Sequence, residues 1–215
     1  MEAGGYAQSV PAARTPALFG QVMALVALTV GVATLGVYVA RESGGALWFI
    51  AWLAALGCLV ALNVANSRGN TSLALVLLMA FGLLIGASVA STVNYYATTD
   101  PTAVRQAFGA TALFVGGLGA GGYAIRRDLS FLYRTLFWLL VALIGAGLVL
   151  IFVHIPAAYT AYSIVGLAIF GLYTVVDFNR LRRAGRDEAI PLAAGIFLDV
   201  LNVFLLFLRL FADSR

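Results

Sequence analysis

Two aspartates lie inside apolar stretches that are long enough to cross a membrane. Asp177 lies in the segment IVGLAIFGLYTVVDFN, and Asp199 lies in the segment IPLAAGIFLDVLNVFLLFL. A carboxylate near the centre of a membrane helix costs about 2.5–3.5 kcal/mol on insertion scales. Such a group is retained mainly where it faces a protein interior, a partner or a water-filled path. Because the other seven of the nine acidic residues fall in expected loops, tails or helix ends, these two are the candidate functional pair.

Helical spacing places each aspartate on a stripe of residues that share one face of its predicted helix. The first stripe contains Ser163, Gly166, Phe170, Tyr173 and Asp177, and the second contains Asp199, Asn202, Leu206 and Arg209. A short loop joins the two helices into an antiparallel hairpin. Counted from that loop at about 1.5 Å per residue, the aspartates lie roughly 9 Å and roughly 16 Å deep. We therefore expect them within about one helical turn of each other.

Two carboxylates that meet in a dry environment are expected to share one proton near neutral pH and to titrate as a unit. The protonated pair would join its two helices through a short hydrogen bond. The deprotonated pair would repel, or would attract a cation, and carboxylate oxygens suit a transient contact with calcium. One interpretation is a pH-gated cation path, and the other is a buried polar pair that only fixes the register of the helices. Spacing leaves both open.

Tyr173 and Asn202, on the two stripes, are possible supporting groups, and so are two arginines, Arg68 and Arg209. Arg68 is expected at the same membrane end as Asp177 and is a candidate counter-charge, with a plain loop arginine as the alternative. Arg209 is expected to extend to the membrane interface rather than to pair with a carboxylate. His154, the only histidine, is predicted in an exposed turn, with a minor pH-sensing role as the alternative. No spacing of Cys and His predicts a metal site.

The composition predicts an all-α membrane protein. The chain is 62% hydrophobic and 10% charged, with a mean hydropathy of +0.99, whereas a soluble domain has about 25% charged residues. Seven apolar runs reach the length of about 20 residues that a spanning helix needs, and they do not alternate as barrel strands do. They cover residues 17–40, 46–65, 71–96, 105–125, 129–153, 158–178 and 189–211. We expect a cytoplasmic tail over 1–16 and one transmembrane domain over 17–212.

The arginines predict the orientation of these helices. All 13 positive residues are arginines, and positive residues concentrate in the cytoplasmic loops of membrane proteins. Nine fall on one expected side, namely Arg14, Arg68, Arg126, Arg127, Arg134, Arg180, Arg182, Arg183 and Arg186. Arg41, Arg105 and Arg215 fall on the other. The N-terminus is therefore predicted in the cytoplasm and the C-terminus outside, and the positive charge needs no nucleic-acid partner.

Glycines recur at the four-residue spacing that lets membrane helices approach closely. Gly82 and Gly86 form one such pair, and Gly117 and Gly121 form another. The segment from Gly119 to Ala124 also matches a loose dinucleotide-binding pattern. That pattern requires a preceding strand, which an apolar helix does not provide. We therefore predict helix packing as the role of both glycine pairs.

The C-terminal half resembles a known family. The segments AYSIVGLAIFGLYTVVDFNRL and IPLAAGIFLDVLNVFLLFLRLF resemble the last two helices of the transmembrane Bax inhibitor motif family, and RRDLSFLYRTLFWLLVALIGAGLVLIF is similar to the start of its fifth helix. The resemblance implies seven helices with the last one in the centre. It also implies a pH-sensitive calcium leak in a bacterial inner membrane, with Asp177 and Asp199 as a hydrogen-bonded latch and calcium as the permeant ion. No cofactor is implied.

The sequence departs from the family pattern at three places. Val176 stands where members often have tyrosine, and Asn66 stands where bacterial members have an arginine that engages the first aspartate, with Arg68 two positions later. The second and third predicted helices also lack a glutamate. One alternative function is a non-conducting protein that binds membrane proteins such as quality-control proteases. A proton-coupled transporter is less expected without an inverted repeat, and an enzyme is least expected without a nucleophile–base set.

Overall fold

The computed structural model describes residues 14–43, 46–152 and 156–213, which form seven long helices, one 3₁₀ turn and no strand. The helices are α1 (Arg14–Ala40), α2 (Leu47–Ser67), α3 (Thr71–Thr99), α4 (Pro101–Ala124), α5 (Leu132–Phe152), α6 (Pro156–Leu181) and α7 (Ala189–Asp213), with the turn η1 at Arg186–Glu188. All seven are long and apolar enough to cross a membrane, as predicted. His154 and residues 1–13 of the predicted tail lie outside the described residues.

The third and fourth helices meet at a single residue, so α4 begins four positions earlier than predicted. The backbone N–H of Asp100 donates to the carbonyl of Tyr96 at 2.9 Å and ends α3. Its side chain accepts the N–H of Ala103 at 3.0 Å, which caps the N-terminus of α4. Pro101 then occupies the first helical position, where its missing N–H has no cost. The Asp100-Pro101 pair thereby takes the place of the loop that was predicted between residues 96 and 105.

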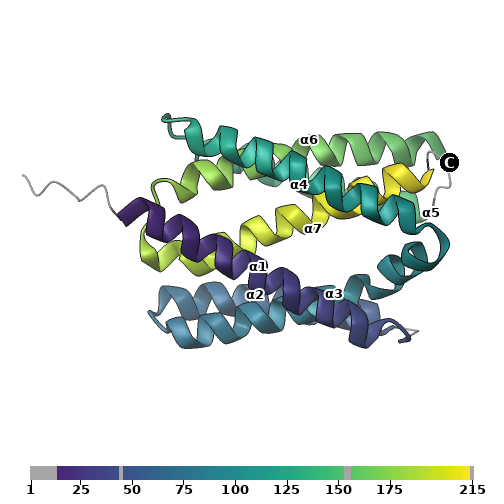
Figure 1. The fold of residues 1–215 in the computed structure, drawn as a ribbon, viewed down its shortest axis with the longest axis horizontal. Helices are drawn as coiled ribbons and strands as arrows, with labels where there is room; N and C mark the ends of the chain where they lie inside the picture. The colour runs from purple at the N-terminus through teal and green to yellow at the C-terminus, as the bar shows by residue number, and fades with distance from the viewer. Residues whose placement is uncertain (1–13, 44–45, 153–155, 214–215) are drawn as a thin grey trace, which may run out of the picture.

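The last helix occupies the centre of the bundle, as the family resemblance implies (Figure 1). α1 and α2 pack on α3, while α4 and α5 pack on α6. α7 runs between these two groups and contacts α1, α4 and α6, with smaller contacts to α2 and α3. Residues on α7 can therefore face both groups of helices, which makes α7 the natural position for a central functional group.

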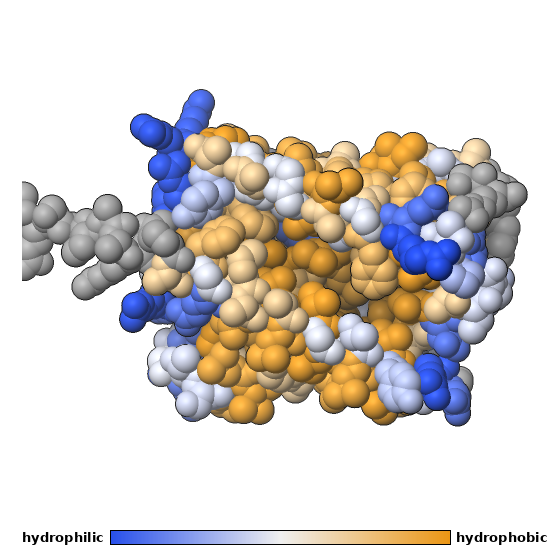
Figure 2. Space-filling view, viewed as in Figure 1, coloured by the Kyte–Doolittle hydropathy of each residue, from blue (hydrophilic) through white to orange (hydrophobic). Residues whose placement is uncertain are grey.

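The outer surface is apolar along most of its length. Figure 2 shows a broad hydrophobic band with hydrophilic residues gathered at its two ends. Large side chains such as Leu113 (81% exposed) and Phe152 (83%) lie in the open on this surface. An apolar surface of this extent is unfavourable in water, and lipid is its natural surrounding. The loops with Arg68, Arg126 and Arg183 lie together at one end, here called the arginine-rich end.

The first glycine pair packs as predicted. A Cβ atom placed on Gly82 would lie 2.9 Å from the Cγ2 atom of Thr29 on α1, and one placed on Gly86 would overlap the carbonyl of Ala33. These two glycines therefore allow the backbones of α1 and α3 to approach closely.

The prediction for the second glycine pair is wrong. Gly117 and Gly121 have no neighbouring atom within 4 Å of a built Cβ position. The close contacts of α4 are made by Gly119, which meets the ring of Phe178, and by Gly122, which meets the Val175 carbonyl. The four-residue pattern is present on α4, but the helix is rotated so that a different pair of its glycines faces α6.

We expect Gly122→Ala to lower the free energy of unfolding by about 1–3 kcal/mol, because the new methyl group would collide with the backbone of Val175. Gly121→Ala is the matched control, since it adds the same methyl group one residue away in open space. It should leave stability unchanged or raise it by up to about 1 kcal/mol through helix propensity. Unfolding of both variants in detergent micelles measures the difference, and equal effects would contradict the packing described here.

Candidate functional site

The two predicted aspartates face the same cavity. Asp177 on α6 is 7% exposed and Asp199 on α7 is 4% exposed. Both line a cavity of about 470 Å³, which Tyr173 and Asn202 also line. With Phe170, which also lines it, the cavity brings together five of the residues that helical spacing placed on the two stripes.

Asp177 lies between three helices. Its Oδ1 atom accepts a hydrogen bond of 2.5 Å from the hydroxyl group of Tyr133, in the first turn of α5. Its Oδ2 atom faces α7 at Gly195, where a built Cβ atom would lie only 2.7 Å away. Arg180, one turn further along α6, lines the same cavity and acts on the Asp177 carboxylate through its charge.

Asp199 has an incomplete set of partners. Its Oδ2 atom is buried and accepts no hydrogen bond from the described part of the protein. The charge of Asp177 and the hydroxyl group of Thr174 act on this carboxylate, but the Thr174 hydroxyl also donates to the Phe170 carbonyl at 2.8 Å. No hydrogen bond between the two aspartates is present among the described residues, so the predicted latch stays a prediction. Burial of an unpartnered carboxylate oxygen is unfavourable, which makes this position a candidate functional site.

An ion pair at the arginine-rich end involves Arg180, which lines the cavity. Arg180 donates to the Oε2 atom of Glu188 through Nε at 2.8 Å and through Nη2 at 2.5 Å. Glu188 belongs to η1, immediately before α7. The pair therefore connects the end of α6 to the turn that precedes α7.

A buried asparagine fixes the loop that precedes α5. The side chain of Asn179 is fully buried. Its Nδ2 group donates to the carbonyls of Gly122 (3.3 Å), Ile125 (2.8 Å) and Arg127 (3.1 Å), and its Oδ1 atom accepts from the Leu129 N–H (3.1 Å) and from Arg183 (2.7 Å). We call this set of contacts the Asn179 clamp. It attaches the α4–α5 loop to α6 only two residues from Asp177.

Asp128 reinforces the Asn179 clamp at the membrane surface. Its carboxylate accepts the N–H of Ser130 at 2.8 Å and a hydrogen bond from Arg183 at 2.8 Å. The hydrogen bonds from Ser130, followed by the Arg183 charge, lower the pKa of Asp128 from 3.8. Because the pKa of Asp128 is lower in the folded protein, its ionised carboxylate stabilises the fold above pH 3.8. This stabilisation is lost as the pH falls through the lowered pKa. The Asp-Leu-Ser motif thus fixes the start of α5 at neutral pH.

Two predicted supporting residues lie away from the aspartates. Arg68 is exposed at the end of α2, and the arginine that acts on Asp177 is Arg180. Asn66, two residues before Arg68, donates instead to the backbone carbonyl of Asp187 at 2.8 Å. Arg209 lies over the ring of Tyr159 at 4.0 Å and lines a second cavity of about 300 Å³. That contact is a cation–π interaction near the end of α7.

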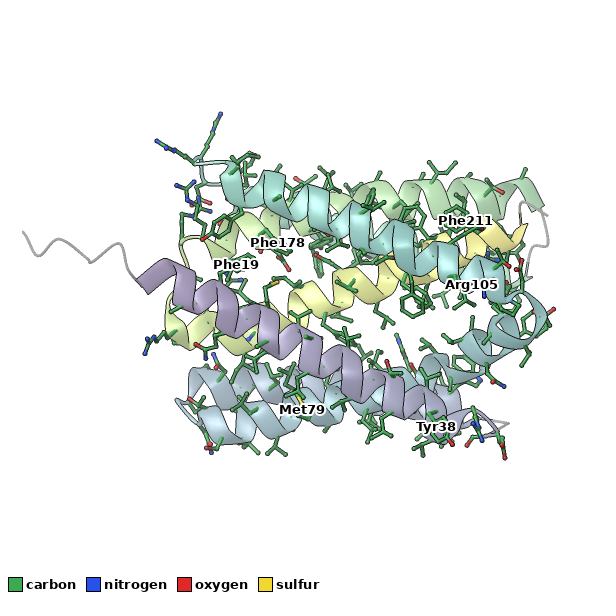
Figure 3. All side chains as sticks on the ribbon, viewed as in Figure 1. Phe19, Tyr38, Met79, Arg105, Phe178 and Phe211 are labelled. Atoms are coloured by element: carbon green, nitrogen blue, oxygen red, sulfur yellow. The ribbon has the colours of Figure 1, made fainter. Side chains whose placement is uncertain are left out.

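Phe178, between Asp177 and Asn179, anchors this part of α6. Its ring lies against Gly119 of α4 and 6.5 Å from the ring of Phe19 on α1 (Figure 3). The consecutive residues 177, 178 and 179 thereby contact α5, α1 and the α4–α5 loop in turn. This three-way attachment fixes the orientation of Asp177.

Sequence reasoning did not identify Tyr133, Asn179, Arg180 or Gly195 as members of the site. Tyr133 is 44 residues from Asp177 along the chain, and no local spacing connects them. Asn179 did leave a signal, because an amide two residues from a buried aspartate in an apolar helix itself needs partners. In the described part of the chain, no three His, Cys, Asp or Glu side chains gather into a potential metal site.

Comparison with known proteins agrees with this architecture. The family described as "Inhibitor of apoptosis-promoting Bax1" matches residues 16–215. A membrane protein of Vibrio cholerae serotype O1 is 32% identical over 154 residues, covering 71% of this chain and 68% of the relative. The inner membrane protein YbhL of Escherichia coli K12 is 26% identical over 174 residues, covering 76% and 73%. A Deinococcus radiodurans protein is 28% identical over 204 residues, covering 88% and 85%. The chain is thus an integral membrane protein that belongs to the Bax inhibitor-1-like family.

Proposed function

We propose that this protein is a calcium leak of a bacterial inner membrane, gated by protonation of Asp177 and Asp199. The observation that carries the proposal is the buried, unpartnered Oδ2 atom of Asp199 in a cavity shared with Asp177. A carboxylate in that position requires a proton or a cation. A binding site that accepts either one in turn is a pH-dependent cation site.

The charge state of the pair determines whether a cation is favoured. When both aspartates are ionised, they repel each other, and a divalent cation between them relieves the repulsion. Carboxylate oxygens are the ligands that calcium prefers. When a proton is bound, the pair loses charge and its two helices can share a hydrogen bond. Calcium passage should therefore increase as the pH rises and decrease as the pH falls.

The second cavity supports a route along α7. It is lined by residues that also line the aspartate cavity, among them Asn202, Tyr162 and Phe170. The two cavities therefore adjoin near Asn202, and the second one continues along α7 to Arg209. An ion that leaves the aspartates would meet the polar side chains of Ser88 and Thr92 in this region.

The arginine-rich end is proposed to face the cytoplasm, with the N-terminus on the same side and the C-terminus outside. Positive residues concentrate in cytoplasmic loops, and the loops of Arg68, Arg126 and Arg183 share this end. The relative YbhL is named as an inner membrane protein. A topology reporter fused to the C-terminus should be active outside the cytoplasm, and cytoplasmic activity would overturn the orientation.

The proposed function predicts a pH-dependent calcium efflux. Purified protein in calcium-loaded liposomes should release calcium faster at pH 8 than at pH 6, because ionised carboxylates attract the cation. Empty liposomes treated identically provide the control. Absence of flux at every pH would contradict the leak. A reproducible membrane-protein partner recovered in the same preparation would then favour the non-conducting alternative.

A further inference from the structure

We propose that Tyr133 is the positioning residue of the gate, holding Asp177 in its ionised, cation-accepting arrangement against Gly195. This inference rests on the proposed function and assigns a role to α5, the outermost element of the site. Tyr133 does not contact the permeant ion in this proposal. It acts through Asp177, by setting the pH at which that carboxylate becomes protonated.

The hydrogen bond between Tyr133 and Asp177 has the geometry of a bond to a charged acceptor. The distance from the Tyr133 hydroxyl oxygen to Oδ1 is 2.5 Å. O–H groups that donate to an ionised carboxylate form bonds of about 2.5–2.7 Å, shorter and stronger than neutral ones. The hydroxyl group therefore stabilises the deprotonated form of Asp177 more than the protonated form. Loss of this donor should make protonation easier.

Gly195 provides the opposite wall of the Asp177 position. The Oδ2 atom of Asp177 occupies space that a Cβ atom on Gly195 would enter, at a separation of 2.7 Å. A side chain at Gly195 would displace the carboxylate from α7 and alter its bond to Tyr133. The carboxylate is thus held between a donor on α5 and a glycine on α7, which leaves it one defined orientation.

The other groups that face Asp177 do not replace the Tyr133 bond. From α6, Tyr173 and Arg180 line the cavity, and Arg180 is itself bonded to Glu188 of η1. From α7, the facing titratable group is Asp199. From α2, the cavity is lined by Trp52 and Leu56, which do not titrate. Among the described residues, Tyr133 is the one side chain that donates a hydrogen bond to Asp177.

The Asn179 clamp explains why the first turn of α5 stays in reach of Asp177. Leu129, whose N–H bonds to Asn179, precedes Tyr133 by four residues. The loop and the carboxylate are therefore attached to the same turn of α6, at positions 179 and 177. A movement of α5 away from α6 would break the hydrogen bond of Tyr133 to Asp177 and would change the charge state of the pair.

The first test is Tyr133→Phe, which removes one oxygen atom and keeps the ring. We expect the midpoint of the flux–pH curve to move to higher pH by about 1–2 units, because the ionised form of Asp177 loses its donor. Tyr123→Phe is the matched control, since it removes the same oxygen atom from a half-buried tyrosine that packs on Phe19 and lines neither of the two cavities. It should leave the midpoint within the error of the wild type.

A readout independent of flux separates this role from the proposed function. Infrared titration of the carboxylic C=O stretch, assigned by its loss in Asp177→Asn, reports protonation of Asp177 directly. Tyr133→Phe should shift this midpoint in the same direction. If the infrared midpoint shifts but the wild type releases no calcium, the positioning role holds and the leak does not. If flux depends on pH but neither midpoint moves in Tyr133→Phe, the positioning role is overturned.

The second variant, Gly195→Ala, disturbs the same hydrogen bond through a methyl group on α7 and changes no titratable group. It should shift the infrared midpoint upward, as Tyr133→Phe does, because it displaces the carboxylate from the tyrosine. The double variant should show no further shift, since only one bond is available to lose. Additive shifts would contradict the claim that both substitutions act on the same hydrogen bond, from Tyr133 to Asp177. This variant also provides the test if Tyr133→Phe does not fold, as judged by its unfolding midpoint in detergent.

Discussion

Asp177→Asn and Asp199→Asn are each expected to reduce calcium flux to the low-pH level at every pH between 6 and 8. Asparagine has the size of the protonated aspartate but cannot ionise, so each variant removes one of the two negative charges that line the cavity. A hydrogen-bonded or charge-assisted contact to an ionic group contributes about 1.5–3 kcal/mol. Its loss corresponds to about 10- to 100-fold weaker cation binding. The effect should therefore be largest at pH 8, where wild-type flux is highest.

The measurement is calcium efflux from proteoliposomes that contain equal amounts of each variant. Glu42→Gln is the control, because it also removes one negative charge but from a side chain that is 84% exposed. It should retain the wild-type pH profile. A pH profile that persists in both aspartate variants would exclude these carboxylates as the gate. A flux that remains high and independent of pH would reverse the proposed assignment of the open and closed charge states.

Asn179→Ala is expected to lower the free energy of unfolding by about 2–4 kcal/mol, the largest stability effect at the site. The substitution removes every hydrogen bond of the Asn179 clamp at once. These include the bond from the backbone N–H of Leu129 and the bonds to three carbonyls of the α4–α5 region. A buried polar group left without a partner costs about 1–3 kcal/mol. The start of α5 should become mobile, so the flux midpoint should shift together with stability.

Unfolding in detergent and hydrogen exchange over residues 122–133 measure this effect. Asn202→Ala provides the comparison, because Asn202 lines the aspartate cavity and, within the described part of the chain, its side chain donates only to the Leu198 carbonyl of its own helix, at 2.8 Å. Its cost should remain below about 1 kcal/mol. If the two alanine variants are equally stable, the clamp does not determine the position of α5.

The sequence alone predicted the seven helices and identified Asp177 and Asp199 as candidate site residues, for a simple energetic reason. A spanning helix must be apolar over about 20 residues, because the bilayer offers no partners for polar groups. The seven runs are therefore visible in the composition, and Asp177 and Asp199 stand out as exceptions. Their neighbours Tyr173 and Asn202 followed from helical spacing, since residues three or four apart share a face. The family resemblance added the central position of the last helix.

The rotation of each helix was decided only by the tertiary structure. In a membrane, the lipid-facing side of a helix is as apolar as its packed side, so the hydrophobic pattern does not show which side is buried. Gly117 and Gly121 illustrate this, because the same helix packs through Gly119 and Gly122 instead. Tyr133 illustrates it again, since its bond to Asp177 joins residues 44 apart through the packing of α5 on α6. The sequence thus determined which residues are exceptional, and the packing determined which groups they meet.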